Sequence, residues 1–276
     1  MSNEVRQIVH AMWTGVAGQW SERAEFLDHR AAAITKALLD GADIATTDRV
    51  LALADGPGGI GLAAASLAAE VVSSDIAPSY ADVVTARAKA AGLTNVAAKL
   101  LDLEEIAEPD ASFNAVVIRE GLMFAADPLA ALGEIRRVLR TDGRLAAAVW
   151  GAKADNPWLA IVMDAVSAQV GHEVPPPGMP GPFALADELR LGELARDAGF
   201  HDVHIDHVPV RFHAPSFEEW WAHTSALAGP IAMVVAGLSD DARAELLDRL
   251  RDAARPYESS DGLDIPGLSL VLRARR

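Results

Sequence analysis

The stretch that decides the fold reads Val50-Leu51-Ala52-Leu53-Ala54-Asp55-Gly56-Pro57-Gly58-Gly59-Ile60-Gly61. Its first five residues are a continuous apolar run, which is typical of a strand buried on both faces of a parallel sheet. Gly56, Gly58 and Gly61 then satisfy the pattern G-x-G-x-x-G directly after that strand and at the start of a helix. In such a turn the glycines permit a tight bend, close approach of a ligand to the backbone, and packing of the helix on the strand.

Short apolar runs alternate with helical patterns along the rest of the chain. Strands are predicted at residues 50–54, 70–75, 96–101, 113–118, 144–150, 200–212 and 268–274, and helices at 4–40, from the glycine cluster to 69, 79–91, 128–139, 157–170, 187–198 and 216–256. Strands separated by helices require a parallel sheet with helices on both faces. We therefore predict an α/β fold with a doubly wound, Rossmann-like sheet.

No clear linker divides the chain, so residues 1–276 are predicted to form a single domain. Residues 1–45 form an N-terminal helical cover, 46–151 the cofactor-binding core, and 152–276 the substrate-side half with a helical insertion at about 216–256. The proline-rich segment 174–182 cannot be regular structure and is either a lid or a stiff surface loop.

Composition excludes several classes of function. The 276 residues are 51 % hydrophobic, contain no cysteine and carry a formal net charge of −15. The charge disfavours nucleic acids and anionic membrane surfaces as partners, and the absence of cysteine excludes disulfides and thiolate metal sites. Because the N-terminus lacks a secretory pattern, we expect a cytoplasmic protein with a small-molecule acceptor. A homodimer is compatible with this composition.

An acid follows the second strand at the place where nucleoside cofactors are held. Asp75 lies 19 residues after Gly56 and closes the run 70–75, so its carboxylate is placed to accept hydrogen bonds from both hydroxyls of an adenosine ribose. The alternative is an ordinary tight turn with a capping aspartate. On these residues alone, more than one nucleoside cofactor fits.

Five segments in order resemble the class I S-adenosylmethionine-dependent methyltransferases, and the ubiquinone/menaquinone-biosynthesis type among them. The resemblance spans about residues 20–150 and rests on 50–58, Asp75, 101–103, 113–124 and 138–145. It implies a mostly parallel, seven-stranded sheet with an antiparallel last strand and helical lid additions. It also implies S-adenosyl-L-methionine as cofactor and methyl transfer to a small, apolar or aromatic molecule by in-line displacement.

The resemblance also assigns positions around that cofactor. The glycine turn would contact the methionine part of the cofactor, and the acid after the second strand would bind its ribose. The acid after the third strand would bind the adenine amino group, and an aromatic residue of the N-terminal helix would cover the cofactor. Arg119 would lie near the methionyl moiety. The implied cofactor-binding residues are Trp20, Asp55, Gly56, Pro57, Gly58, Asp75, Ile76, Asp102, Leu103 and Arg119.

The first strand departs from the family pattern at two positions. This chain has Ala52 where the family usually has an acid, and Ala54 where it usually has glycine. Asp55 lies three residues beyond the missing acid, so we hypothesise that it replaces that acid by facing the ammonium group of the cofactor. A second reading is a degenerate module that binds cofactor weakly or not at all.

Methyl transfer mainly needs proximity and orientation, with a general base where the acceptor carries a proton. Glu120, directly after the fourth strand, and His223, in the helical block before the last strand, are the catalytic candidates; the alternative for each is a surface or capping role. Aromatic and methionine side chains in the added segments or at strand ends either line an apolar acceptor pocket or pack the added helices: Met12, Trp13, Trp20, Met123, Phe124, Trp150, Trp158, Trp220 and Trp221. No metal site is predicted, because alternation along a strand separates His204 from His201 and His207.

The main rival is an NAD(P)-dependent oxidoreductase, since the glycine turn and Asp75 suit that cofactor as well. Against it, neither Tyr80 nor Tyr257 has a lysine four residues further on, so the Tyr/Lys pair of short-chain reductases is missing. The third hypothesis is the degenerate, non-catalytic module.

Overall fold

Five parallel strands form the centre of the computed structural model, which describes residues 2–227 and 229–276. These strands are β1 (Arg49–Leu53), β2 (Glu70–Asp75), β3 (Val96–Leu100), β4 (Phe113–Arg119) and β5 (Leu139–Trp150). Strand β1 pairs with β2 on one side and β4 on the other. Successive strands are therefore added in opposite directions from β1, which places the topological switch point, where doubly wound sheets bind ligands, between β1 and β4.

Two long antiparallel strands complete the sheet. β8 (Gly262–Arg275) lies between β5 and β6 (His201–Ala214) and runs antiparallel to both, giving the order β3-β2-β1-β4-β5-β8-β6. The predicted mostly parallel sheet with an antiparallel last strand is confirmed. The described residues contain one strand more than the seven expected, because the two-residue β7 (Glu258–Ser259) pairs with the start of β8.

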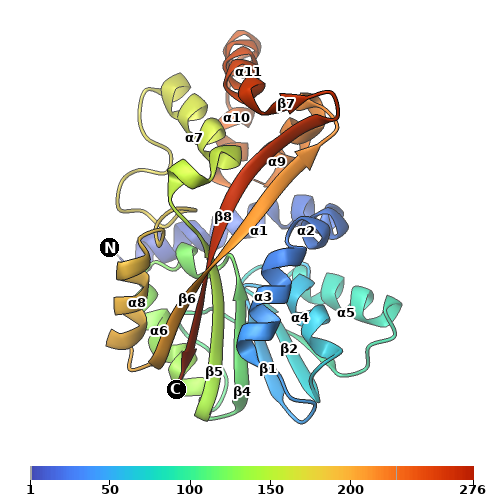
Figure 1. The fold of residues 1–276 in the computed structure, drawn as a ribbon, viewed down its shortest axis with the longest axis vertical. Helices are drawn as coiled ribbons and strands as arrows, with labels where there is room; N and C mark the ends of the chain where they lie inside the picture. Colours follow the sequence, from blue (N-terminus) through green and yellow to red (C-terminus); the bar gives the residue numbers. More distant parts are fainter. Residues whose placement is uncertain (1, 228) are drawn as a thin grey trace.

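Helices cover both faces of the sheet (Figure 1). α3 (Ala32–Ala42), α4 (Gly59–Ala65) and α5 (Tyr80–Ala90) pack beside β1 to β5, and α6 (Pro128–Val138) packs with α8 (Glu188–Asp197) near β5 and β6. The middle residues of β1, β4 and β5 are fully buried. The continuous apolar runs of these strands follow from burial on both faces.

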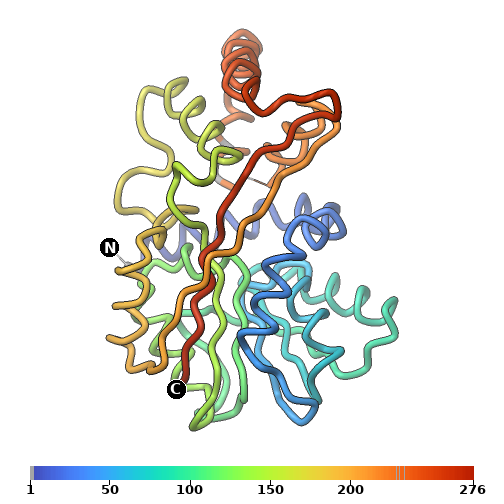
Figure 2. The backbone as a smooth tube through the Cα atoms, viewed as in Figure 1, coloured from blue at the N-terminus to red at the C-terminus, as the bar shows by residue number. Residues whose placement is uncertain are grey.

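A helical cap stands on the far ends of β6 and β8, which continue well beyond the parallel strands (Figure 2). It contains α7 (Pro157–Val170), α9 (Phe217–Leu227), α10 (Pro230–Ala236) and α11 (Asp240–Ala254). The predicted break at Gly229-Pro230 separates α9 from α10. Short 3-10 turns lie at η1 (Leu122–Phe124), η2 (Lys153–Asp155) and η3 (Arg255–Tyr257). None of the described helices combines the length and apolar character that a bilayer span requires.

The N-terminal segment runs between the sheet and the cap (Figure 1). Instead of one helical block, it forms α1 (Ser2–Glu22) and α2 (Ala24–Arg30) before α3. α1 contacts α5 and α9, so it spans from the cofactor side of the sheet to the cap. Strands β1 to β5 and their connecting helices lie within residues 49–150, and the division of the chain at 46–151 stays a prediction.

Ala54 occupies a backbone conformation that favours glycine. Its φ is +49°, in the left-handed region where a Cβ atom costs about 1–2 kcal/mol. The Cβ of Ala54 also fills the space beside Gly121, because a Cβ there would lie 2.4 Å from it. The usual family glycine at this position therefore has a physical reason, and this chain retains the turn at the expense of local strain.

We predict that Ala54→Gly raises the free energy of unfolding by about 0.5–1 kcal/mol, since relief of the left-handed strain exceeds the entropy that glycine loses on folding. Urea unfolding measures the change. Ala115→Gly, in the buried interior of β4, is the matched control and is expected to lower the same quantity. If Ala54→Gly lowered the free energy of unfolding as much as Ala115→Gly, the strain argument would be wrong.

Candidate functional site

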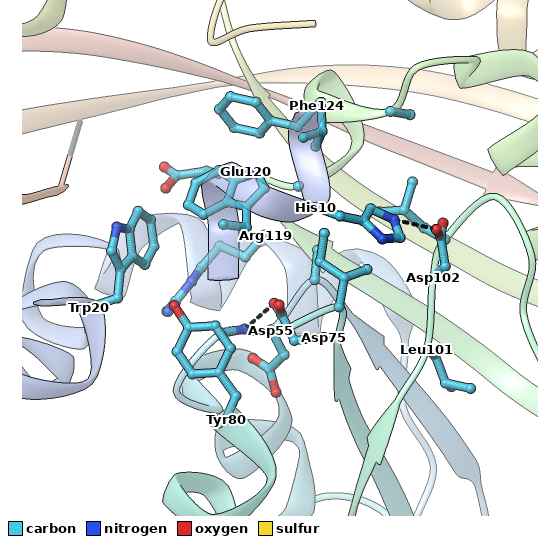
Figure 3. Close-up of a pocket in the computed structure, with 18 of the residues that line it drawn as sticks. His10, Trp20, Asp55, Asp75, Tyr80, Leu101, Asp102, Arg119, Glu120 and Phe124 are labelled. Carbon is cyan, nitrogen blue, oxygen red and sulfur yellow. Dashed lines mark hydrogen bonds and ion pairs between the residues drawn. The ribbon is translucent and has the colours of Figure 1, made fainter. Parts of the chain in front are cut away.

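Two adjoining cavities lie at the carboxyl ends of the parallel strands. The first is lined by the glycine turn, the acids after β2 and β3, and the residues that follow β4 (Figure 3). The second, of ≈ 420 Å³, lies between the sheet and the cap. Six residues line both cavities: Trp13, Trp20, Leu27, Arg30, Glu120 and Phe124. The two cavities therefore meet at the end of β4 beneath α1 and α2.

The glycine turn is held in shape by Asp75. Gly56 and Gly58 have φ values of +53° and +93°, and a Cβ at Gly58 would lie 2.9 Å from Val84. The two carboxylate oxygens of Asp75 accept hydrogen bonds from the N–H groups of Gly56, at 2.9 Å, and Ala77, at 3.0 Å. Each oxygen retains acceptor capacity, so Asp75 can hold the turn and still receive two hydroxyl groups.

Asp55 points into the protein instead of toward an open space. Its Oδ1 accepts a hydrogen bond from Ile60 N–H at 3.0 Å, and its Oδ2 accepts from Gly61 N–H at 3.1 Å and from the Ser73 hydroxyl at 2.5 Å. The hypothesis that Asp55 faces an ammonium group is therefore disfavoured. Its carboxylate instead caps the first turn of α4.

The position of Asp55 also explains the missing acid in β1. A Cβ at Gly61 would lie 2.4 Å from Asp55 Oδ2 and 3.3 Å from the Cβ of Ala52. The carboxylate thus occupies space beside the small Ala52 side chain, where the family acid would project. Burial raises the pKa of Asp55 to about 6, against the lowering effect of the Ser73 hydrogen bond and the charge of Arg119.

Asp102 contacts the N-terminal helix. Its Oδ2 accepts from Arg6 Nε at 2.7 Å and lies 2.6 Å from His10 Nε2, and its Oδ1 accepts from Glu104 N–H at 2.8 Å. Partial burial would raise the pKa of Asp102, but these hydrogen bonds and the Arg6 charge together hold it below its usual value. Figure 3 shows His10 and Asp102 on one side of the first cavity and Trp20 and Tyr80 on the other.

Arg119 lines the first cavity while its guanidinium is tied to the N-terminal helices. It donates to Thr35 Oγ1 at 2.9 Å and contacts Asp28 at 3.3 Å. Asp28 also accepts from Arg87, which in turn donates to the carbonyl of Pro57 at 2.6 Å. The carbonyl of the glycine turn is thus connected to α2 through charged side chains.

Four residues that line the first cavity have a buried polar atom without a hydrogen-bond partner, and two of them, Trp20 and Tyr80, lie beside the glycine turn. The atoms are Trp20 Nε1 and the Tyr80 hydroxyl, and a Cβ at Gly56 would lie 3.9 Å from the Trp20 side chain and 3.8 Å from that of Tyr80. Burial raises the pKa of Tyr80, so its hydroxyl stays protonated. Because buried donors are normally paired, these two groups fit a polar ligand lying against the glycine turn. Ile76, Leu103, Asp102 and Arg119 complete the lining.

The second cavity is mainly aromatic. Trp13, Trp20, Trp150, Trp158 and Trp220 line it together with Met123 and Phe124. Trp158 stacks on Phe212 with centroids 3.8 Å apart. Met12 and Trp221 are not among the described residues that line this cavity, and Trp221 packs against the hydrophobic core, which is the alternative role. The proline segment contributes Val174, Pro175, Pro180 and Pro182 and thus forms one wall.

Glu120 and His223 both reach the second cavity but have different surroundings. Glu120, with φ of +62°, forms a buried ion pair with Arg30 at 2.8 Å. The His223 ring stacks on Phe26 at 3.8 Å, and its Nδ1 is buried without a partner. Burial lowers the pKa of His223, with a contribution from the charge of Arg23. Among residues 2–227 and 229–276, no group of three His, Asp or Glu side chains is arranged to hold a metal ion.

Sequence reasoning missed the charged residues that α1 and α2 bring to the site. Arg6, His10, Trp13, Ala17 and Trp20 all follow a spacing of three or four residues, so they share one face of α1. This periodicity is a usable signal for the first two. Arg30 carries no comparable signal, because its partner Glu120 lies 90 residues away.

The comparisons with known proteins identify the central segment. Residues 51–147 match the family model of the methyltransferase domain. An uncharacterized protein of Mycobacterium tuberculosis is 31 % identical over 156 residues, which is 56 % of this chain and 56 % of that protein. The demethylmenaquinone methyltransferase of Thermus thermophilus is 40 % identical over 101 residues, 35 % of this chain and 44 % of the enzyme. The chain thus spans about half the length of the curated relatives it matches.

Solved structures of low sequence identity share the fold. The YcgJ protein of Bacillus subtilis superposes with a TM-score of 0.61 at 18 % identity, over 88 % of this chain and 97 % of that chain. A phosphoethanolamine N-methyltransferase of Haemonchus contortus, solved with S-adenosylhomocysteine, gives 0.54 at 18 % identity, over 87 % and 51 %. These structures share the fold of this chain, and the family model describes residues 51–147 as a methyltransferase domain.

The raised pKa of Asp55 gives a pH-dependent stability. The folded protein binds more protons than the unfolded chain between about pH 4 and pH 6, so this group's contribution to the free energy of unfolding falls as the pH rises through that window. We predict that the free energy of unfolding of the wild type, minus that of Asp55→Asn, falls by up to about 3 kcal/mol from pH 4 to pH 7. Urea unfolding at both pH values measures it.

A variant with the opposite sign serves as the control. The hydrogen bond from Arg211 lowers the pKa of the exposed Asp264, so its contribution appears as the pH rises. That pKa shift lies below about pH 4, so the wild type minus Asp264→Asn difference is expected to change little between pH 4 and pH 7. If the Asp55 difference were equally constant or grew over that range, the proposed buried state of its carboxylate would be wrong.

Proposed function

We propose that the chain is an S-adenosylmethionine-dependent methyltransferase that acts on a small apolar or aromatic molecule. One observation carries this proposal: the cavity built on the glycine turn opens into an aromatic cavity, and the two share the wall that contains Glu120. Methyl transfer requires a donor and an acceptor to meet in line. The methyltransferase domain match does not favour the NAD(P)-dependent alternative.

The cofactor-binding roles are proposed residue by residue. Gly56, Pro57 and Gly58 would bring backbone against the ligand, and Asp75 would receive the ribose hydroxyls through its free acceptor capacity. Trp20 Nε1 and the Tyr80 hydroxyl supply donors that otherwise lack partners. Asp102 Oδ2 already faces Arg6 and His10, whereas its Oδ1 accepts only from Glu104 N–H and keeps acceptor capacity for an adenine amino group. The bound cofactor supplies an activated methyl group on sulfur.

The acceptor is proposed to bind in the second cavity. Its aromatic walls favour a planar or apolar molecule, and seven of the eight Trp and Phe residues described in its lining lie outside the family match. Glu120 and His223 are the proposed proton acceptors. The lowered pKa of His223 keeps its ring neutral near pH 7, which a general base needs. The Thermus relative supports placing the cofactor half near the ubiquinone/menaquinone-biosynthesis type.

We predict that S-adenosylhomocysteine at 100 times its Kd stabilises the protein by about 2.7 kcal/mol and raises its Tm by roughly 5–10 °C, whereas NAD and NADP leave the Tm unchanged. A thermal-shift titration with S-adenosylmethionine, S-adenosylhomocysteine, NAD and NADP measures this. Stabilisation by NAD alone would overturn the proposal, and no response to any of the four would indicate the degenerate module.

Asp75→Asn tests the ribose contact within the same assay. We expect its affinity for S-adenosylhomocysteine to fall at least about tenfold, because an amide can offer only one oxygen to the two hydroxyls. Asp127→Asn is the matched control, since Asp127 caps α6 and asparagine caps equally well. Equal affinities for the two variants would remove Asp75 from the cofactor site.

A further inference from the structure

The wall between the two cavities contains a buried ion pair with unused hydrogen-bonding groups. Arg30, the last residue of α2, donates from Nη2 to Glu120 Oε2 at 2.8 Å. Their side chains are only 10 % and 8 % exposed. Such a pair is costly to bury, because desolvation of both charges offsets much of their attraction. Its position beside an aromatic cavity therefore needs a reason other than stability.

Each partner of this pair has one buried polar atom that is not hydrogen bonded. Arg30 Nε is a donor without an acceptor, and Glu120 Oε1 is an acceptor without a donor. Leaving such groups unpaired is costly, because each has lost its hydrogen bonds to water. A ligand group that both donates and accepts would satisfy them together. A hydroxyl has this property, whereas an ether or an ammonium group offers only half of it.

Aromatic rings fix the Arg30 guanidinium in place. Its Cζ lies 5.5 Å from the ring centroid of Trp150, 5.8 Å from that of Trp158 and 5.2 Å from that of Phe212. These distances are within the range of cation–π attraction. The rings hold the cation at the end of β5, and all three line the second cavity. An aromatic acceptor lying among them would bring its polar substituent to the ion pair.

From this geometry we propose that Arg30 and Glu120 form a recognition site for the hydroxyl of a phenolic acceptor. Arg30 Nε–H donates to the hydroxyl oxygen, and the hydroxyl donates to Glu120 Oε1. The inference rests on the proposed methyltransferase function and names the class of acceptor. A phenol is favoured over an alkyl alcohol because its pKa, about 10, lets a carboxylate assisted by a neighbouring cation take its proton.

Protons and charges balance in the methyl transfer that this arrangement allows. The phenolic proton moves to Glu120 Oε1 while Arg30 stabilises the negative charge that develops on the oxygen. That oxygen forms the new bond to the methyl carbon as the carbon–sulfur bond breaks, and the electron pair of that bond stays on sulfur. The products are a methyl aryl ether, a neutral thioether and a protonated Glu120, which then releases its proton to water. No further co-reactant is needed.

The test measures binding without any cofactor. Isothermal titration calorimetry compares 2-naphthol with 2-methoxynaphthalene, which lacks the donor, and with 2-naphthylamine, whose nitrogen is a poor acceptor. We expect the wild type to bind 2-naphthol about tenfold more tightly than either analogue. In Glu120→Gln, the preference for 2-naphthol over the methyl ether is expected to fall below about threefold. Asp40→Asn, which breaks the exposed Lys36–Asp40 pair, is the control and should keep the preference.

A second variant keeps the test decisive if Glu120→Gln does not fold. Glu120→Gln leaves Arg30 buried without its counter-charge, which destabilises a protein strongly, whereas replacing both partners with apolar residues is often tolerated. The double variant Arg30→Met/Glu120→Met is therefore expected to fold and to bind 2-methoxynaphthalene as well as 2-naphthol. Equal binding of naphthol and its methyl ether by the wild type would overturn the hydroxyl site, as would a preference for the amine.

The two proposals fail in distinguishable ways. Loss of the hydroxyl preference with an intact response to S-adenosylhomocysteine would remove only the phenolic site. Absence of that response with an intact hydroxyl preference would instead remove the methyltransferase function and leave an aryl-hydroxyl binding site. Wild-type protein with S-adenosylmethionine is then expected to form 2-methoxynaphthalene, and Glu120→Gln to form it at least about 100-fold more slowly.

Discussion

The buried carboxylate of Asp55 is the contact on which the geometry of the first cavity depends. It ties the first turn of α4 to β2 by accepting from two backbone N–H groups and from Ser73. With that turn fixed, the Gly56 N–H donates to Asp75, and the backbone at Gly56 lies beside Tyr80 and Trp20. The absence of an acid at Ala52 is therefore compensated by a carboxylate from three residues further along the chain. An unusual glycine-turn sequence retains an ordinary turn.

The parts of the molecule that follow from nearby residues were predictable. Continuous segments of sequence determine the strands, the glycine turn and the place of Asp75 at the end of β2, because apolar runs and turn residues act locally. The contacts of Asp102 were not, because its partners Arg6 and His10 come from a helix more than 90 residues away. The same holds for the pairing of Arg30 with Glu120. The hydrogen bonds of Asp55 to α4 and Ser73 were not predictable either, because spacing alone does not show which face of a turn a short side chain occupies.

The residues that line the two cavities divide into those inside the segment matched by the family model and those outside it. Residues 51–147 supply the glycine turn, Asp75, Asp102 and Glu120, whereas Trp150, Trp158, Phe212 and Trp220 in the second cavity come from the cap or lead into it. Loops and added elements on a fixed scaffold are where proteins of one fold differ in the ligands they take. The ion pair of Arg30 and Glu120 joins the two parts, since one partner ends β4 and the other comes from α2.

Helix α1 has a consequence for how the two cavities communicate. Trp13 contacts Trp20 and Phe124 edge-on, with ring centroids 5.2 and 4.9 Å apart, and all three side chains line both cavities. One helix, α1, thus contributes to the walls of both cavities. A ligand that stabilises the position of α1 from one cavity alters the free energy of ligand binding in the other, and thermodynamic reciprocity makes the two effects equal. A ligand in the first cavity and a ligand in the second would accordingly be coupled through α1, in addition to any contact between the two molecules.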